Sequence, residues 1–410
     1  MKVILILVFT AVSAMAADLH YRIAAEIDPA AGMVNAKTRV RVRSVPSGNL
    51  KFYLNSNFRV ANLSCRPRCT YSFQKEKAGE YRYASQAAPL ILTFATLPSG
   101  VVVDMEYQGK LPPTNWGENL VQADWTELAL YSAWFPLMPD TPLTYDLQIS
   151  IDPKYGVSGA GKVHRPKPGS WRITKNEPTF DINLVAAEQL RTQTLSTAGA
   201  GVQVTSAGVK AEAVDAIAVK ASEMLQQFSK WFGPPRSSGF NIVLNPRKRG
   251  GAYARPGFVS LPFGEKDTPE GIERWLAHEV AHLWWLGAPT LTWEDWLNEA
   301  FAEYSSLMFV RHQHGAKAVD AYIERSRKRA ADAPPIWGLD RNSDSAHAAL
   351  YSKGAMILWN LEQQIGQETF NKVLRTRVKR GVRTTSGFLR LLNELAGPEV
   401  ASQVESRLRQ

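Results

Sequence analysis

The sequence predicts an α+β protein with two main domains, an N-terminal antiparallel β-domain followed by a mainly helical domain. Apolar and polar side chains alternate from residue 19 to about residue 182, in runs bounded by Pro, Gly, Asn or Asp, which is typical of half-buried antiparallel strands. From about residue 211 the apolar residues recur with helical spacing instead. The chain is also long enough for more than one core, because it has 410 residues of which 45% are hydrophobic.

Strands and helices can be placed from these patterns. The alternation is clearest over residues 19–27 and 34–42, with a turn at Asp28-Pro29 between them. Further strands are expected at 51–54, 89–94, 101–107, 144–151 and 240–244. Helices are expected at 212–232, 269–286, 293–314, 316–330, 349–365, 367–378 and 385–395. Thr268 and Thr292 are expected N-caps, Pro269 occupies a first helical position, and Gly315 ends a helix.

A stretch rich in Ser, Thr, Ala and Gly at residues 196–208 separates the two patterns. We therefore expect a first domain over residues 17–205 and a second over residues 206–410. The first domain contains no group of residues that could form a catalytic site alone. Functional residues are expected mainly in the second domain.

The first residues are typical of a secretory signal. Met1-Lys2 precedes an apolar run over residues 3–12, and small residues follow up to Ala16 and Ala17. A single membrane anchor is the alternative, but the run is shorter than the ~20 residues that span a bilayer. We expect residues 1–16 to be removed, leaving an exported protein, periplasmic or secreted, with no stable membrane span.

Cys65 and Cys69 are the two cysteines of the chain. In an oxidising compartment such a pair is expected to form a small-loop disulfide. The alternatives are two free thiols or a metal site, and a metal site would need two further ligands that the neighbouring sequence does not offer.

The chain has a net charge of +10, carried in part by basic runs at residues 325–329 and 375–380. Basic runs can indicate binding to nucleic acid. These runs lie in helix-patterned segments without interleaved exposed aromatic residues, and the chain is expected to be exported. Solvated helical faces are the better interpretation, and no nucleic-acid partner is expected. Acidic surfaces or acidic peptides remain an alternative.

Residues 278–282 read His-Glu-Val-Ala-His inside the helix expected at 269–286. Four residues make slightly more than one helical turn, so His278 and His282 project from one face and can bind one cation, with Glu279 beside them. A catalytic zinc site needs a third protein ligand and an open position. Glu299, on the next expected helix, is the candidate.

The same motif also arises by chance in helices whose histidines belong to the core or the surface. Three features favour a metal site here: the flanking Leu283-Trp284-Trp285, the acidic helix that follows, and the expected export. Glu303 lies one turn after Glu299 and could accept the second N–H of a ligating histidine. Surface exposure is the alternative for Glu303.

The segments HEVAHLWW and WLNEAFAEY resemble the aminopeptidase N family of gluzincins, also known as the membrane alanyl aminopeptidase family. Its pattern is HExxH followed by WLNEGFA. Residues 134–140 are similar to that family's FPCFDEP segment, and residues from about 211 resemble its thermolysin-like catalytic domain. The resemblance implies a short, two-domain, bacterial-type zinc peptidase without the helical C-terminal domain of larger members, holding one Zn²⁺ per chain and taking peptides as substrates.

The resemblance also implies roles for single residues. Glu279 would be the base that activates a water, and Tyr351 matches the tyrosine of the family's Y-x-K-G segment, which donates a hydrogen bond to the oxyanion. Without the resemblance, Tyr351 reads as a core aromatic. The sequence departs from the family in that the interval from His282 to Glu299 is two residues shorter, a difference that falls in residues 287–291.

A second departure concerns the substrate strand. The family's G-x-M-E-N motif aligns with residues 251–257, so Gly251, Ala252 and Tyr253 are expected to bind substrate. Ala254 stands where the family has the glutamate that binds the substrate's α-amino group, and Arg255 stands where it has asparagine.

Glu127 lies near the segment that supplies the family's other contact to the amine, and either takes over that role or is an ordinary acid. Arg255 could instead clamp a substrate carboxylate. An aminopeptidase is the leading hypothesis. An endopeptidase or another exopeptidase is the alternative because of Ala254, and an inactive zinc-bearing peptide-binding protein is a third. The sequence does not predict the oligomeric state.

Overall fold

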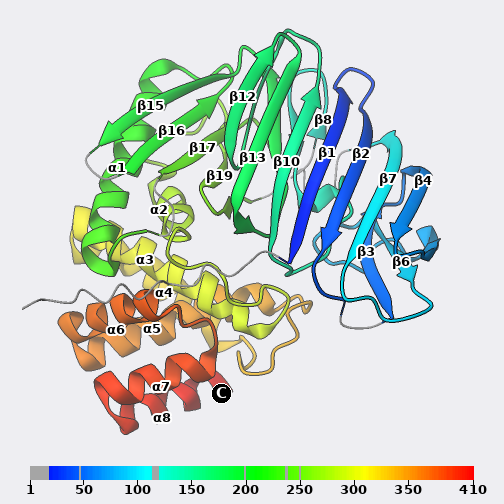
Figure 1. The fold of residues 1–410 in the computed structure, drawn as a ribbon. Helices are drawn as coiled ribbons and strands as arrows, with labels where there is room; N and C mark the ends of the chain where they lie inside the picture. The colour runs from blue at the N-terminus through cyan, green and yellow to red at the C-terminus, as the bar shows by residue number, and fades with distance from the viewer. Residues whose placement is uncertain (1–17, 46–47, 113–119, 198–199, 236–238, 249–250) are drawn as a thin grey trace, which may run out of the picture.

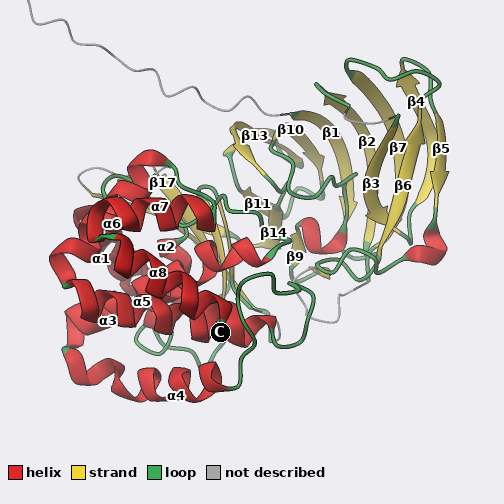
Figure 2. Ribbon diagram, turned by 90° about the horizontal axis from the view of Figure 1, so that it is seen from below, coloured by secondary structure: helices red, strands yellow, loops and turns green. Residues whose placement is uncertain are grey.

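The computed structural model describes residues 18–45, 48–112, 120–197, 200–235, 239–248 and 251–410. The expected signal, residues 1–16, lies outside the described residues. Figures 1 and 2 show a β-rich region formed by the first half of the chain beside a helical region formed by the second half. This arrangement confirms the predicted fold class. No helix in the described ranges is long and apolar enough to cross a bilayer.

The first half forms three sheets. The largest has the strand order β12-β13-β10-β1-β2-β7-β4, and the smaller ones have the orders β3-β6-β5 and β11-β14-β9-β8. The strands are β1 (Leu19–Asp28), β2 (Met33–Val42), β3 (Asn49–Asn55), β4 (Arg59–Arg66), β5 (Thr70–Phe73), β6 (Ala87–Thr93), β7 (Val101–Lys110), β8 (Leu120–Val121), β9 (Thr126–Leu128), β10 (Leu143–Ser150), β11 (Tyr155–Gly159), β12 (Lys162–Lys167), β13 (Ser170–Thr179) and β14 (Leu184–Glu188).

Strand β1 shows why the alternating sequence folds this way. Leu19, Tyr21 and Ile23 are buried on one face of the largest sheet, whereas the residues between them face outward. The pairing of β1 with β2 is antiparallel as predicted, but β1 pairs with β10 in parallel, with Leu19 opposite Leu143. Sequence periodicity carries no information on which distant strand becomes the neighbour. Cys65, in β4, and Cys69, just after it, form a disulfide with a Cα–Cα distance of 5.5 Å.

The second half contains a five-stranded sheet of order β15-β16-β17-β19-β18, in which β18 is an edge strand. The strands are β15 (Arg191–Thr197), β16 (Ala200–Ser206), β17 (Gly239–Asn245), β18 (Tyr253–Arg255) and β19 (Phe258–Pro262). Strand β16 pairs in parallel with β17, and Val202 packs into the same core as the helices that follow. This sheet therefore contains strands from both sides of the expected boundary at residue 205.

The helices are α1 (Ala211–Phe232), α2 (Glu273–Ala281), α3 (Trp296–His314), α4 (Asp320–Ala331), α5 (Gly354–Ile365), α6 (Gln367–Arg380), α7 (Thr385–Ala396) and α8 (Pro398–Arg409). Helix α2 is shorter than predicted. Thr268 accepts a hydrogen bond from the N–H of Gly271, but the helix itself begins at Glu273. After Ala281 the chain tightens into a turn in which the N–H of Leu283 bonds the carbonyl of Val280.

Two further elements differ from the prediction. The helix expected over residues 349–365 starts as a π-helical turn at Ala348–Lys353, where the N–H of Gly354 bonds the carbonyl of Ala349, five residues back. Helix α8 was not predicted. Thr292 caps a 3₁₀ turn at Trp293–Asp295 that leads into α3, and α3 ends at Gly315 with φ 83°, as predicted.

Helices α2 and α3 pack side by side and carry the motif residues. Between and beneath them lie buried aromatic rings, including Trp285 and Phe301, whose centroids are 5.4 Å apart. The guanidinium of Arg377 on α6 lies over both rings and donates a hydrogen bond to the carbonyl of Leu297. These contacts fix the two helices relative to each other.

Gly354 lies where α5 approaches α3. A Cβ at this position would meet the Cβ of Ala300 at 2.5 Å, so Gly354→Ala must push the helices apart and should destabilise the protein by about 1–3 kcal/mol. Thermal unfolding measures the loss. Gly201→Ala is the control, because an added Cβ there meets nothing within 4 Å. Equal unfolding midpoints for the two variants would contradict the packing described.

Candidate active site

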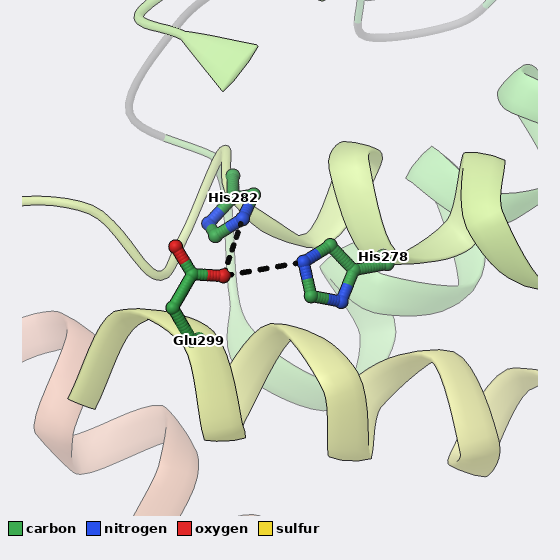
Figure 3. Close-up of side chains that lie close together, drawn as sticks. All are labelled: His278, His282 and Glu299. Atoms are coloured by element: carbon green, nitrogen blue, oxygen red, sulfur yellow. Dashed lines mark ion pairs between the residues drawn. The ribbon is translucent and has the colours of Figure 1, made fainter. Parts of the chain in front are cut away.

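Three side chains from α2 and the start of α3 point at one place (Figure 3). Nε2 of His278 lies 3.4 Å from Oε2 of Glu299, and Nε2 of His282 lies 3.5 Å from the same oxygen. The ligand atoms of all three residues lie within 4.8 Å of one another. Helical spacing accounts for the pair on α2, and the packing of α2 on α3 brings in the carboxylate.

These distances fit a tetrahedral zinc ion. Ligands at about 2.0–2.1 Å from zinc are separated by roughly 3.3–3.4 Å along the edges of a tetrahedron. The other ring nitrogens are already engaged, since Nδ1 of His278 is 2.8 Å from Oε2 of Glu303 and Nδ1 of His282 is 3.1 Å from the carbonyl of Trp285. Both acceptors favour a proton on Nδ1, which leaves each Nε2 as a lone-pair donor for a metal.

The electrostatics of the cluster also favour a cation. Burial lowers the pKa of His278, but hydrogen bonds to Glu299 and Glu303 outweigh burial and raise this pKa to about 10. Burial raises the pKa of Glu299, whereas the positive charge of His282 and hydrogen bonding to both histidines hold it well below its usual value. The buried carboxylates therefore attract positive charge, which protons supply when no metal is bound.

Glu303 is held in place by three donors. In addition to His278, Nη1 of Arg274 lies 2.8 Å from Oε1, and the hydroxyl of Tyr322 donates to the same oxygen. Burial raises the pKa of Glu303, but hydrogen bonding to His278 and the charge of Arg274 lower it to about 2. A carboxylate fixed in this way orients the His278 ring.

A cavity of about 440 Å³ opens beside the cluster. Glu279 lines it and is only 5% exposed, and burial raises the pKa of its carboxyl. Tyr351 also lines it, from the π-helical turn, with its ring 5.9 Å from the His278 ring and nearly parallel to it. Burial raises the pKa of Tyr351 well above its usual value, so its hydroxyl is a donor at neutral pH.

Comparisons with known proteins agree with this geometry. Residues 265–406, which carry Glu279, Tyr351 and the three clustered ligands, match the model of the peptidase family M1 domain. Over these residues the chain is similar to that family.

The curated relatives with this domain are distant. An alanine/arginine aminopeptidase from Saccharomyces cerevisiae is 26% identical over 152 residues, covering 33% of this chain and 18% of the relative. Aminopeptidase N from Streptomyces lividans is 26% identical over 220 residues, covering 46% of this chain and 25% of the relative. The chain thus spans a quarter or less of these relatives.

Solved structures share the whole fold. The M1 zinc metallopeptidase from Deinococcus radiodurans has a TM-score of 0.75 at 18% identity, and the match covers 96% of this chain and 94% of that one. The leukotriene A4 hydrolase from S. cerevisiae has a TM-score of 0.71 at 15% identity, with 95% and 66% covered. At these identities the comparisons show a common fold. Together with the family match, they confirm the resemblance predicted from the motifs.

The edge strand β18 and the residues just before it border the same cavity. Gly251, Ala252, Tyr253, Ala254 and Arg255 all line it. The Arg255 guanidinium is engaged within the protein, because Nε lies 2.7 Å from Oδ2 of Asp181 and Nη1 lies 2.8 Å from the carbonyl of Ala254. It also packs against the rings of Tyr131 and Phe180.

The structure does not bring Glu127 to the cavity. Glu127 lies on β9 with 0% exposure, and its carboxylate pairs with Arg247 at 3.2 Å. Oε1 accepts hydrogen bonds from the hydroxyls of Tyr253 and Ser260, at 2.9 and 2.6 Å. These contacts use the capacity of the Glu127 carboxylate to accept hydrogen bonds, and they connect β9 to β18 and β19. Sequence position near the substrate segment did not reveal that Arg247 would meet it.

Sequence reasoning missed several residues of the cavity wall, among them Asp295, Arg341 and His347. Asp295 accepts a hydrogen bond from Asn298 and pairs with Arg341 at 2.9 Å. Asp295 lies four residues before Glu299, a spacing that could have indicated a shared face. His347 lies four residues before Tyr351, and this spacing could likewise have indicated that the two side chains share a face.

Glu127 and Arg247 predict a stability effect. Glu127→Ala leaves the 1%-exposed Arg247 side chain without its carboxylate, which should destabilise the protein by about 3–5 kcal/mol. Chemical denaturation provides the measurement. Glu188→Ala is a matched control that removes an exposed partner of Lys154 and should leave the midpoint nearly unchanged. A stable Glu127→Ala protein with altered recognition of free amines would show instead that Glu127 reaches substrate.

Proposed function

We propose that the chain is a zinc-dependent peptidase that hydrolyses peptide bonds, and that it acts as an aminopeptidase. The observation that carries the proposal is the convergence of His278, His282 and Glu299 beside Glu279 and Tyr351 on one cavity. A structure of the D. radiodurans protein is described as bound to a Tyr-Ser-Ala substrate. That fold relative, in which a tripeptide binds, supports short peptides as substrates here.

His278, His282 and Glu299 would hold one zinc ion per chain. When bound, zinc polarises the scissile carbonyl and brings the pKa of a bound water toward about 7. Glu279 takes the proton of the attacking water on its carboxylate and delivers it to the leaving amine. The hydroxyl of Tyr351 donates a hydrogen bond to the oxygen on which negative charge develops.

The edge strand β18 offers a way to orient a peptide. Its partner in the sheet is β19, to which it pairs antiparallel, and its other edge lies along the cavity wall. An extended substrate can add to such an edge through main-chain hydrogen bonds, which do not depend on substrate side chains. This mode places the scissile bond beside Glu279 without requiring the glutamate that Ala254 replaces.

Recognition of the substrate's amino group needs another carboxylate. Ala254 has none, and Glu127 is buried elsewhere. Among the described acids that line the cavity, Asp140 is exposed and neither belongs to the metal cluster nor pairs with a base, and it accepts a hydrogen bond from Thr290 at 2.7 Å. The lack of a carboxylate at Ala254 and the burial of Glu127 also favour the alternative function, an endopeptidase or another exopeptidase that does not select a free amine.

Export also belongs to the proposal. The pattern of the first 16 residues supports it, and so does the disulfide between Cys65 and Cys69, since disulfides persist mainly in oxidising compartments. The periplasm and the extracellular space fit these observations equally.

Metal analysis tests the zinc site. The purified protein should hold one zinc per chain, and His282→Ala and Glu299→Ala should lose it because each removes one of three ligands. Glu303→Gln should retain a weakened site, about 10–100-fold lower in affinity, because only the orientation of His278 is affected. Unchanged zinc in both ligand variants would rule out the proposed site.

Digestion of one peptide with a free and with an acetylated N-terminus tests the reaction, with products read by mass. Stepwise loss of N-terminal residues from the free form alone is expected for an aminopeptidase. Internal cleavage of both forms would establish the alternative. Glu279→Gln is the control, since it should keep zinc and lose nearly all turnover. Substantial hydrolysis by Glu279→Gln would place the base elsewhere.

A further inference from the structure

We propose that His347 is a positioning residue that clamps the ring of Tyr351 against His278 and so holds the Tyr351 hydroxyl beside the metal cluster. This inference rests on the proposed function, because it concerns how Tyr351 is held for its part in the reaction. It adds a residue that neither the motif nor the family resemblance indicated.

The geometry that supports it is a pair of ring contacts made by Tyr351, one with His347 and one with His278. The ring centroids of His347 and Tyr351 lie 4.3 Å apart with an interplanar angle of 9°. Those of Tyr351 and His278 lie 5.9 Å apart with an angle of 11°. The phenol ring is therefore nearly parallel to both imidazoles. The 5.9 Å separation lies within the range of about 4.5–7 Å at which aromatic pairs attract, and the 4.3 Å separation is a closer stacked contact.

The two imidazoles are held differently. The His278 ring is fixed by Glu303, 2.8 Å from its Nδ1, and belongs to the proposed metal site. His347 comes from the same chain segment as Tyr351, four residues earlier, and its ring stacks on one face of the Tyr351 ring. His347 itself lines the cavity and is exposed. Without its ring, that face of Tyr351 would be open to water in the cavity.

The position of the Tyr351 hydroxyl depends on the backbone turn that carries this residue and on the orientation of its ring. Tyr351 belongs to a π-helical turn, a conformation that occurs mostly as single turns inserted in α-helices. Its hydroxyl lies at the far end of a rigid ring, so a small rotation of the side chain moves the donor by a large distance. A displacement of about 1 Å at a reacting group can cost about 10²-fold in rate.

The chemistry of His347 suits stacking. Although part of the His347 side chain is exposed, partial desolvation in the cavity wall lowers the pKa of His347, against the charges of Glu299 and Glu303, which raise it. An uncharged imidazole packs on a phenol as a flat aromatic group. The feature of His347 that holds Tyr351 is therefore its flat aromatic ring. Phenylalanine also provides such a ring, whereas glutamine does not.

Steady-state kinetics of the zinc-loaded enzyme test the clamp. His347→Ala should lower kcat about two- to tenfold, the range that a lost aromatic contact allows, with KM, zinc content and unfolding midpoint unchanged. His347→Phe should restore kcat, and His347→Gln should not. His312→Ala is the matched control. His312 is an exposed histidine on α3 whose ring centroid lies 5.6 Å from that of Trp231. This variant should behave as the unaltered enzyme.

A double-mutant cycle separates positioning from other roles. If His347 acts through Tyr351, the variant that combines His347→Ala with Tyr351→Phe should be no slower than Tyr351→Phe alone. Full additivity of the two losses would overturn the inference, as would rescue by glutamine rather than phenylalanine. Unaltered kcat in His347→Ala would overturn it while leaving the proposed function intact.

A readout without catalysis covers the case in which the unaltered enzyme hydrolyses no peptide, a result that would reject the proposed function. With tyrosine rings isotopically labelled, the NMR signals of Tyr351, assigned by comparison with Tyr351→Phe, should shift in His347→Ala and return in His347→Phe. Signals that stay in place in His347→Ala would show that His347 does not hold the ring, whatever the activity.

Discussion

Burial of carboxylates around two imidazoles is the constraint on which the rest of the structure depends. Glu279 and Glu303 are 5% and 7% exposed, and Glu299 lies against both histidines. Such a group of acids is costly to bury unless positive charge meets it. Helices α2 and α3 have to stay aligned if the carboxylates and the imidazoles are to share this positive charge. The aromatic rings of Trp285 and Phe301, together with Arg377, keep the helices aligned.

The grouping of His278, His282 and Glu299 could be predicted because it depends on short-range geometry. His278 and His282 share a face by helical spacing alone, and Glu303 follows Glu299 by one turn on the next helix. The packing of one helix on its neighbour in sequence then completes the cluster. The strand pattern of the first half was predictable for the same reason, since alternation is a local property.

Features that depend on distant partners could not be predicted. Glu127 meets Arg247, 120 residues later, in the buried layer between β9 and β18, and its place in the sequence suggested a substrate contact. The parallel pairing of β1 with β10 and the engagement of Arg255 by Asp181 have the same origin. The π-helical turn depends on which carbonyl accepts the N–H of Gly354, and Gly354 lies where α5 closely approaches Ala300 of α3.

The cavity beside the cluster is lined by residues from both halves of the chain, including Tyr81 and Tyr83 from the first half and Trp275 from the second. At about 440 Å³ it has the size of pockets that enclose small organic molecules. A folded domain cannot enter such a space, and only a few residues of an extended chain fit. The proposed peptidase would therefore select substrates by size before their side chains are recognised.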